Sequence, residues 1–476
     1  LTQAAVEFGV DPKGELWKLP AQFVGPYAEQ DARLAYDLYK FFRVEINKQD
    51  LETIFDLETR LTPCLIDMTY RGIRVDLERC ERSKQQLLKR EKQTYRDIEK
   101  EAGFEVEIWA ATSLAKAFDQ LKVAYPRTAK GAPSFTKAFL SENPHPFAKM
   151  IVEARNLNKI QGTFINNIMK FVGSDCRIHG HINQLRSDEG GTVSGRLSMS
   201  NPNLQQIPAR DPELGPMIRS LFLPEEGELW AAIDYSQQEP RILTHYASVF
   251  GTWKGLPLGG AKEFVDGYTN NPDMDFHTMV AEMANISRKQ AKTINLGMMY
   301  GMGVRKLADQ LDLEFDDAKE LTQQYHKRVP FVKELMNGVS RSVDQKSDGS
   351  LRSLKGRKCR FDMFEPMGYD VQKAMPLKEA KATYGETAPL KRAYTYKALN
   401  RLIQASAADM TKQAMVDLYE RGERPLLQVH DELGCSVSSI EHAKKIRGVM
   451  EAAIKLQVPS KCDIDLGPSW GETKEI

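Results

Sequence analysis

Two short apolar runs along this chain each end at an aspartate. The run at residues 229–236 is apolar as far as Ile233 and becomes polar at Asp234. The run at 426–432 is apolar to Val429, apart from one glutamine, and leads into Asp431. Apolar runs of this length, bounded by polar residues, favour buried β-strands over helices. We therefore predict two strands that each present a carboxylate at one end, the second at a tight hairpin turn.

Each aspartate also has a purely structural explanation. An aspartate between a strand and a helix, such as Asp234, is most often a helix N-cap. An aspartate in a turn, such as Asp431, is mostly structural. The occurrence of two such strand ends in one chain favours a different arrangement, in which both carboxylates meet and hold two divalent cations about 3.5–4 Å apart, as in phosphoryl transfer.

Much of the remaining chain has the spacing of helices. An apolar stripe from Ile54 to Met68 predicts a helix with one buried face, and residues 77–102 predict a long charged helix that forms an exposed arm. Further helices are predicted at residues 27–39, 150–171, 238–248, 276–341 and 392–420. The segment 361–388 has weak periodicity, so we expect an insertion or a mobile loop there.

Four residues spaced four apart, Arg288, Lys292, Leu296 and Tyr300, share one face of a predicted helix. They do so because each step of four residues drifts by only about 40° around a helix. This face offers two cations, then an apolar side chain, then an aromatic ring. A triphosphate could lie along the cations while a base packs beyond them. A solvated charged turn is the alternative, and the two carboxylate strands favour the triphosphate.

A loop at residues 194–208 is rich in side chains that donate hydrogen bonds, among them Arg196, Asn203 and Gln205. Such donors suit the sugar and minor-groove acceptors of DNA, which look alike for all base pairs. A polar surface loop is the alternative for this segment on its own.

Composition agrees with a cytosolic enzyme of several domains. The 476 residues exceed one hydrophobic core, so we expect about two to four domains or subdomains. The six cysteines lack zinc-ligand spacing and predict reduced thiols. No apolar run reaches the roughly 18 residues that span a bilayer, and no signal peptide is visible. The net charge of +1 does not by itself indicate nucleic-acid binding, so any binding of nucleic acid must come from local basic patches. Because the first residue is Leu1, the chain is open to being part of a longer protein.

Together these segments resemble the motifs of family A DNA polymerases, the bacterial polymerase I group and its phage relatives. The resemblance runs in order from about residue 45 to Trp470 and rests on five segments: 130–134 for the thumb-tip loop, 195–208 for the primer-template loop, 234–241 for the first palm motif, 288–301 for the fingers helix and 429–432 for the last palm motif.

This resemblance implies an α+β fold shaped as a right hand, with an antiparallel palm sheet and mostly helical fingers and thumb. The implied divisions are residues 1–44 as the C-terminal remnant of a 3′–5′ exonuclease domain, 45–180 as thumb and first palm helix, 181–250 as palm with the primer-binding loop and first metal aspartate, 251–391 as fingers, and 392–476 as palm with the second metal aspartate.

The implied enzyme is a DNA-directed DNA polymerase that adds deoxynucleotides to a primer 3′-hydroxyl by two-metal-ion nucleotidyl transfer and releases pyrophosphate. Asp234, Asp431 and the backbone carbonyl of Tyr235 would hold two Mg2+ ions, and Lys292 would protonate pyrophosphate. Glu239 would exclude a ribose 2′-hydroxyl. The implied deoxynucleotide contacts are Arg288, Lys292, His277, Leu296, Glu239, Tyr300 and Tyr235. The implied primer-template contacts are Arg196, Asn203, Gln205, Asn400, Gln404 and His430.

The segment from Tyr27 to Asp31 resembles the last motif of the 3′–5′ exonuclease joined to such polymerases. The earlier carboxylates of that site are not in this chain, so we expect this remnant to be inactive. A separate or missing exonuclease portion, or one half of a split polymerase, would explain it. The other expected partners are primer-template DNA and deoxynucleoside triphosphates. We expect no membrane, a monomer, and a location in the bacterial cytoplasm, that of the host if phage-encoded.

Two rival functions remain open from the sequence. A single-subunit RNA polymerase shares the palm and fingers arrangement, but Glu239 and the primer loop argue against it. A DNA-binding protein that keeps the fold without catalysis is the second, and the presence of Asp234, Asp431 and Lys292 argues against that.

Leu296 stands where many cellular relatives carry an aromatic residue and where many phage members carry leucine, which indicates a role in phage DNA replication. A leucine should stack less well than an aromatic ring on the incoming nucleotide. We therefore expect Leu296→Phe to insert nucleotides faster than the unmutated chain in single-turnover measurements. Equal rates would contradict the stacking argument.

Overall fold

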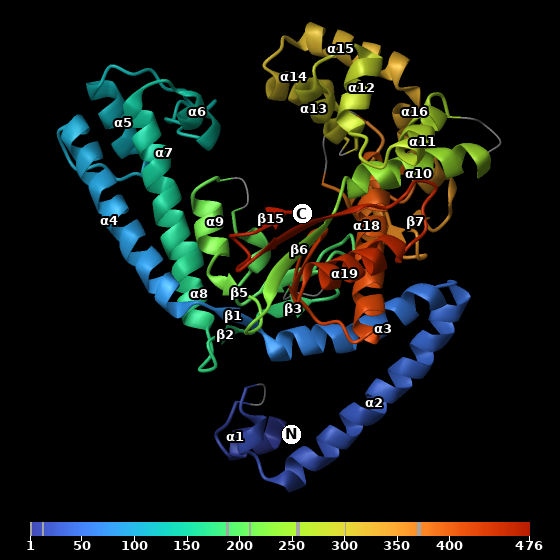
Figure 1. Cartoon of the computed structure of the whole chain (residues 1–476). Helices are drawn as coiled ribbons and strands as arrows, with labels where there is room; N and C mark the ends of the chain where they lie inside the picture. Colours follow the sequence, from blue (N-terminus) through green and yellow to red (C-terminus); the bar gives the residue numbers. More distant parts are fainter. Residues whose placement is uncertain are drawn as a thin grey trace.

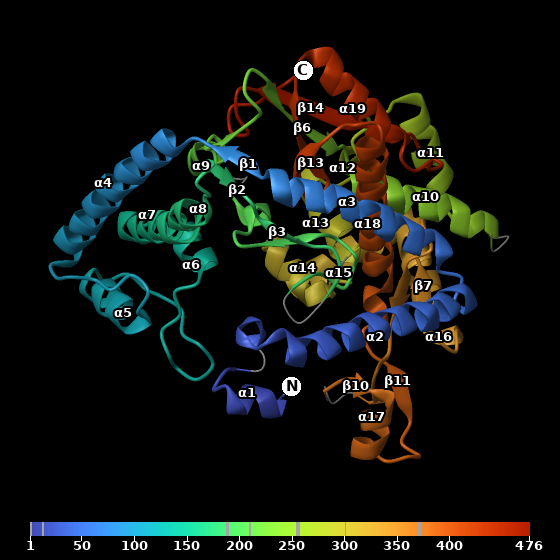
Figure 2. The same cartoon turned by 90° about the horizontal axis from the view of Figure 1, so that it is seen from below.

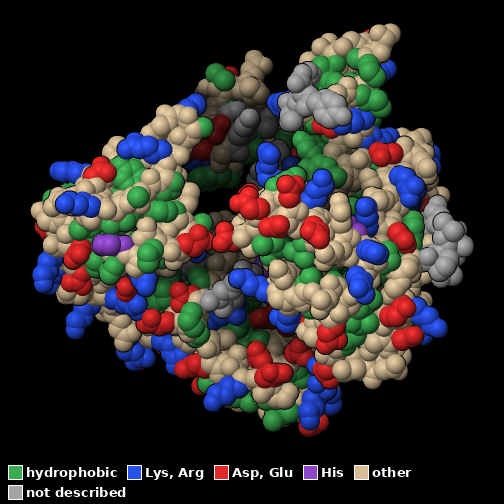
Figure 3. Space-filling view, turned by 90° about the horizontal axis from the view of Figure 1, so that it is seen from above, with side chains coloured by type: hydrophobic (Ala, Val, Ile, Leu, Met, Phe, Trp, Pro, Cys, Tyr) green, Lys and Arg blue, Asp and Glu red, His purple; other side chains and the backbone are tan. Residues whose placement is uncertain are grey.

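A central sheet carries two helical arms in this protein, which we describe from a computed structural model (Figure 1). The structure describes residues 2–11, 14–186, 190–208, 211–253, 258–299, 301–368 and 373–476. One arm holds α4 to α7, and the other holds α10 to α16. The space-filling view shows a deep hollow between the two arms (Figure 3).

The central sheet is antiparallel, with strand order β12-β13-β6-β14-β15. Its strands are Pro425–Val429, Glu432–Val437, Leu229–Tyr235, Cys462–Gly467 and Lys474–Glu475 in that order. One face packs on α18 (Ala398–Glu420) and α19 (Ile440–Ala452) in the main hydrophobic core. The helix α3 (Glu52–Arg71) packs on α18, and its predicted apolar stripe is buried. The two predicted strands, β6 and β12, therefore belong to one sheet, with β13 between them.

The first arm is a bundle around its own aromatic core. Its helices are α4 (Leu77–Ala102), α5 (Ala111–Gln120), α6 (Lys137–Glu142) and α7 (Pro146–Lys159), and a π-helical turn at Ile160–Ile165 leads into α8 (Asn166–Phe171). The helix α4 has the predicted bounds, but the expectation of an exposed arm was wrong for one face. Leu87 and Ile98 are buried because α4 lies along α7 and its neighbours.

The second arm packs against the long helix α18 through α10 and α16. Its helices are α10 (Gln238–Trp253), α11 (Ala261–Asn270), α12 (Phe276–Ala284), α13 (Arg288–Met299), α14 (Val304–Leu311), α15 (Phe315–Arg328) and α16 (Pro330–Gln345). The predicted helical stretch 276–341 is thus divided by turns into five helices.

Short strands and turns tie the arms to the central sheet. The strands are β1 (Ile73–Val75), β2 (Arg177–Ile178), β3 (His181–Asn183), β4 (Ser198–Ser200), β5 (Phe222–Leu223), β7 (Ser350–Arg352) and β8 (Lys358–Arg360). The short helices are α9 (Leu214–Arg219) and the 3-10 turns Leu16–Lys18, Leu204–Gln206 and Thr395–Lys397.

The segment predicted as an insertion or mobile loop forms a small projecting unit of strands and a helix in its described part (Figure 2). The strand β9 (Met363–Pro366) pairs with β10 (Met375–Pro376) and β11 (Leu390–Arg392), and α17 (Leu377–Tyr384) lies beside them. The strands are too short to give a clear period in the sequence, which is why the pattern missed them.

Several helix boundaries also differ from the predictions. The helix expected from residue 392 begins at Ala398, because residue 392 still belongs to β11 and Tyr394 has a left-handed φ of 63°. The helix expected at 27–39 extends over Ala21–Lys48 as α2, which follows α1 (Thr2–Glu7). Among the described helices, none is both long and apolar enough to cross a bilayer.

A buried ion-pair network fastens α3 to α18. Lys412 Nζ lies 2.8 Å from Glu58 Oε1, and Arg357 bridges Glu58 at 2.5 Å and Asp409 at 2.9 Å. Only 1% of the Lys412 side chain is exposed. An exposed pair, Arg60 with Glu420 at 2.7 Å, joins the same two helices.

The two pairs predict unequal stability effects. Lys412→Met should lower the free energy of unfolding by about 3 kcal/mol, because it leaves buried Glu58 short of a partner. Arg60→Leu is the matched control and should cost about 0.5 kcal/mol, since exposed pairs are weak. Urea denaturation measures both, and equal losses would contradict the argument.

Candidate active site

Asp234 lies on the open face of the central sheet because of the alternation along β6. Ala231, Ile233 and Tyr235 point into the main core, whereas Trp230 and Ala232 join a second apolar cluster on the opposite face. Successive side chains of a strand alternate between faces, so Asp234 lies on the same face as Trp230 and Ala232. The strand itself continues one residue beyond the predicted end, to Tyr235.

The hairpin β12–β13 brings Asp431 to the same end of the sheet. Val429 pairs with Glu432 across a tight turn in which His430 has a left-handed φ of 58°. The backbone N–H of Tyr235 donates to the carbonyl of Asp431 at 3.3 Å. The two aspartates, almost two hundred residues apart in sequence, therefore lie side by side, as predicted.

A row of carboxylates crosses the sheet at this point. In the strand register Glu432 and Asp463 both stand opposite Asp234, so all three side chains share one face. Burial first, and then the charge of Asp431, raise the pKa of Asp234 well above its ordinary value. Burial also raises the pKa of Asp431, although Arg196 and His430 oppose this shift. Crowded, buried carboxylates of this kind favour a bound cation.

The donor set fits a hard divalent cation. Asp234 Oδ1 is buried and has no hydrogen-bond partner among the described residues, so this oxygen is available as a ligand. The Tyr235 side chain points away, because its hydroxyl donates to the carbonyl of Met450 at 2.6 Å. Tyr235 can therefore offer a ligand at the site of the aspartates only through its backbone carbonyl. Within the described chain no cluster of three His, Cys, Asp or Glu side chains has the geometry of a metal site.

The helices α12 and α13 carry the predicted cations. Arg288 and Lys292 are exposed on α13 and Leu296 is half-buried, as expected for a shared open face. Arg288 pairs with Asp275, the N-cap of α12, at 2.6 Å. His277 follows on α12 and is largely buried. Tyr300, the last residue predicted for this face, lies outside the described residues.

Gln237 links these helices to the aspartates, and the sequence reasoning gave it no role. It lies three residues after Asp234, and its Oε1 accepts the backbone N–H of Phe276 at 2.8 Å. Its Nε2 donates to the carbonyl of Met274 at 2.9 Å. The start of α12, and with it His277, is thereby fixed beside β6.

Known proteins resemble this chain along nearly its whole length. The sequence profile of DNA polymerase family A matches residues 77–472. The chain belongs to this family. It is 35% identical to a DNA-directed DNA polymerase of Pseudomonas phage M6, over 99% of this chain and 74% of that protein. It is 31% identical to DNA polymerase I of Geobacillus stearothermophilus, over 90% of this chain and 47% of that protein.

A solved structure agrees with the sequence comparisons. It is a polymerase domain of Pol1 from M. smegmatis in complex with a DNA primer-template and dNTP, with 27% identity, a TM-score of 0.72, and coverage of 90% of this chain and 72% of that one. The predicted right-hand fold and the activity of a template-directed DNA polymerase are confirmed. The central antiparallel sheet corresponds to the palm of this fold. We propose that the arm of α4 to α7 is the thumb and that the second arm is the fingers.

The loop at residues 194–208, which was predicted to bind the primer-template, reaches the site of the two aspartates. Arg196 donates to Glu239 Oε1 at 2.6 Å, so the loop contacts the first turn of α10 beside Asp234. Gly195 has a φ of +83°, and a Cβ there would lie 2.7 Å from Arg357 Nε. Only glycine fits this close approach without a shift of the arginine.

Four other predicted DNA contacts lie on two different elements. The Asn203 side chain caps the short turn by accepting the N–H of Gln205, and Gln205 donates to Gln428. Asn400 and Gln404 lie one turn apart on the half-exposed side of α18, while most of that helix is buried. Asn400 and Gln404 are thus partly exposed to solvent, whereas the side chains of Asn203 and Gln205 make hydrogen bonds within the protein.

Tyr27 and Asp31 are not part of the palm site. Both are on α2, which lies apart from the sheet (Figures 1 and 2). The Tyr27 hydroxyl bonds to the Asp31 carboxylate, which raises the pKa of Tyr27.

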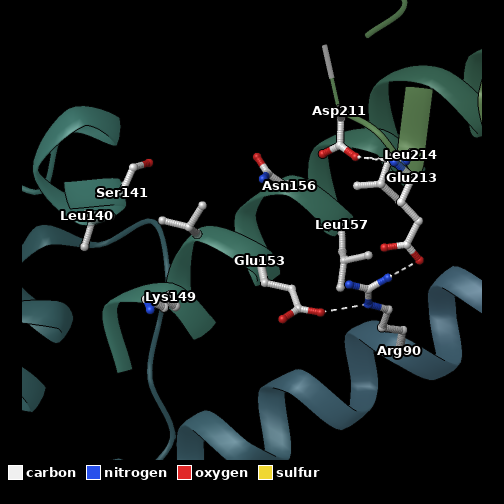
Figure 4. A pocket seen from close by; sticks show the side chains of 11 residues that line it. Arg90, Leu140, Ser141, Lys149, Glu153, Asn156, Leu157, Asp211, Glu213 and Leu214 are labelled. Atoms are coloured by element: carbon white, nitrogen blue, oxygen red, sulfur yellow. Dashed lines mark hydrogen bonds and ion pairs between the residues drawn. The ribbon is translucent and has the colours of Figure 1, made fainter. Parts of the chain in front are cut away.

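A cavity of about 380 Å³ lies between the thumb and α9, away from the aspartates (Figure 4). Arg90 of α4 lines it and bonds to Glu153 of α7 at 2.7 Å and to Glu213 at 2.6 Å. These contacts connect the first arm to the segment that precedes α9. The cavity therefore lies at the contact between this arm and the rest of the protein.

The crowded aspartates predict a gain of stability when one is neutralised. In metal-free buffer, Asp234→Asn and Asp431→Asn should each raise the free energy of unfolding by about 1 kcal/mol, because an amide removes a repelling charge. Exposed Asp344→Asn is the control and should change nothing. Thermal unfolding with a chelator tests this, and destabilisation by both variants would contradict it.

Proposed function

We propose that Asp234 and Asp431 are the metal-binding pair of this polymerase and that the metal is Mg2+. Family A DNA polymerases are metal-dependent in general. The observation that carries the proposal is the meeting of two carboxylates on the open face, one with a buried oxygen that lacks a partner. Two Mg2+ ions bound there would activate the primer 3′-hydroxyl and neutralise the triphosphate. The Tyr235 carbonyl would complete the protein ligands.

The incoming deoxynucleotide would lie along α13. Its phosphates would contact Arg288, Lys292 and His277, and Lys292 would donate the proton that leaves with pyrophosphate. Its base would pack near Leu296, with Tyr300 beyond. Glu239 stands in the first turn of α10, next to the aspartates, where a carboxylate would exclude a ribose 2′-hydroxyl.

The hollow between thumb and fingers would hold primer-template DNA. The M. smegmatis relative was solved with such DNA and a dNTP, which supports the same ligands here. The contacts proposed for the nascent pair and primer end are Arg196, Asn203, Gln205, Asn400, Gln404 and His430. We also propose the domain limits 1–44, 45–180, 181–250, 251–391 and 392–476 for exonuclease remnant, thumb, palm, fingers and palm.

Biological setting is inferred from the relatives. Polymerases of Pseudomonas phage M6 and Acinetobacter phage SH-Ab 15497 are 35% and 32% identical to this chain. We propose that the protein replicates phage DNA in the bacterial cytoplasm and acts there as a monomer.

Primer extension tests the metal pair. With Mg2+ and deoxynucleotides the unmutated chain should extend a primer, and Asp431→Ala should slow extension by about a thousandfold or more. Binding of primer-template, measured by fluorescence anisotropy, should change little, and Asp344→Ala should behave as the unmutated chain. Binding without any extension by the unmutated chain would refute the proposal. Extension with ribonucleotides alone would favour an RNA polymerase.

We further propose that this chain does not proofread by itself. Tyr27 and Asp31 stand on an exposed helix, and the described residues hold no three-ligand cluster there. A mispaired primer should therefore be degraded no faster by the unmutated chain than by Asp31→Ala. A 3′–5′ nuclease activity that depends on Asp31 would refute this.

A further inference from the structure

A chain of three buried polar side chains ends at His277. The hydroxyl of Tyr325, on α15, donates to Asn295 Oδ1 at 2.7 Å. The Asn295 side chain, on α13, places its Nδ2 3.0 Å from His277 Nδ1 on α12. Tyr325 is 0%, Asn295 1% and His277 9% exposed. Three fingers helices thus meet through two hydrogen bonds that water does not reach.

The direction of both hydrogen bonds follows from what each group can donate. Tyr325 must place its single proton on an acceptor, and the described residues offer its hydroxyl no contact besides Asn295 Oδ1. The amide oxygen therefore faces the tyrosine, and the amide NH2 faces the histidine. An NH2 group can only donate, so His277 Nδ1 must be unprotonated and accept. A reversed amide would leave the buried tyrosine proton without an acceptor, which is costly.

The charges around His277 act in the same direction. Burial lowers the pKa of His277 most, and the cations Lys292 and Arg288 lower it further. Asp275 alone opposes them, and it is itself paired with Arg288. The ring is therefore neutral near pH 7, and its one proton lies on Nε2.

We propose that Tyr325 and Asn295 are positioning residues that lock His277 as the neutral Nε2–H tautomer, so that it offers the incoming triphosphate a single, directed hydrogen-bond donor. This rests on the proposed role of His277 in phosphate binding. Arg288 and Lys292 supply the positive charge of the site, and His277 adds a donor whose direction is fixed by the fold. A free histidine would change tautomer and charge near neutral pH.

Nitrogen NMR tests the lock without any need for activity. The full chain has eight histidines, so labelling with 15N-histidine gives a simple spectrum, in which His277→Gln identifies the signal. From pH 6 to 8 the unmutated chain should show an unprotonated Nδ1 and a protonated Nε2. Asn295→Leu should release the ring to a mixture of tautomers, in which part of the protein carries the proton on Nδ1. A protonated Nδ1 at pH 7, or no change in Asn295→Leu, would overturn the proposal.

Kinetics test what the lock does for the substrate. Tyr325→Phe should raise KM for deoxynucleotides about fivefold, the effect of one hydrogen bond, with kcat less affected. Tyr246→Phe is the matched control, since this partly buried tyrosine bonds to Ser406 at 2.7 Å and lies outside the chain of contacts. An equal rise in both variants would mean a merely structural role and would overturn the proposal. If a variant loses the single Nε2–H tautomer in the NMR spectrum but keeps the KM of the unmutated chain, the proposed role of His277 in phosphate binding would be refuted.

Discussion

The antiparallel register of β6 with β13 and β14 is the constraint on which the palm site depends. It places Glu432 and Asp463 opposite Asp234 and sets the hairpin turn so that Asp431 lies beside it. A slip by one residue would turn Asp234 into the main core and Tyr235 out of it. The apolar residues on the two faces of β6 hold that register, because each face packs into its own cluster.

The same register creates an electrostatic cost. Four acidic side chains meet at a poorly solvated place, and the pKa values of Asp234, Asp431 and Glu432 are all raised. Arg196 compensates part of this charge, since it lowers the pKa of Asp431 and bonds to Glu239. Lys461 compensates another part, because it lies 3.1 Å from Asp463. Amides or apolar residues at these positions would make the folded protein more stable. The presence of four acidic side chains therefore indicates a functional role rather than a structural one.

The fingers are attached to this site by polar contacts of fixed direction. Gln237 holds the start of α12 next to the palm strand, and the buried chain from Tyr325 to His277 holds α12, α13 and α15 together. Buried hydrogen bonds tolerate little change in geometry. The positions of the side chains that we propose as phosphate contacts are therefore set, relative to the aspartates, by Gln237, Asn295 and Tyr325.

The sequence by itself determined the two aspartate strands, the stripe of α3, the bounds of α4 and the cationic face of α13, because each depends on local periodicity or on a motif. It missed the unit at β9 to β11, whose strands are too short to show a period, and the buried face of α4, which exists only because α7 packs there. Only the tertiary structure decided the neighbours of Asp234 and the links through Gln237 and Asn295. These contacts join residues distant in sequence, and no local pattern encodes which of them will meet.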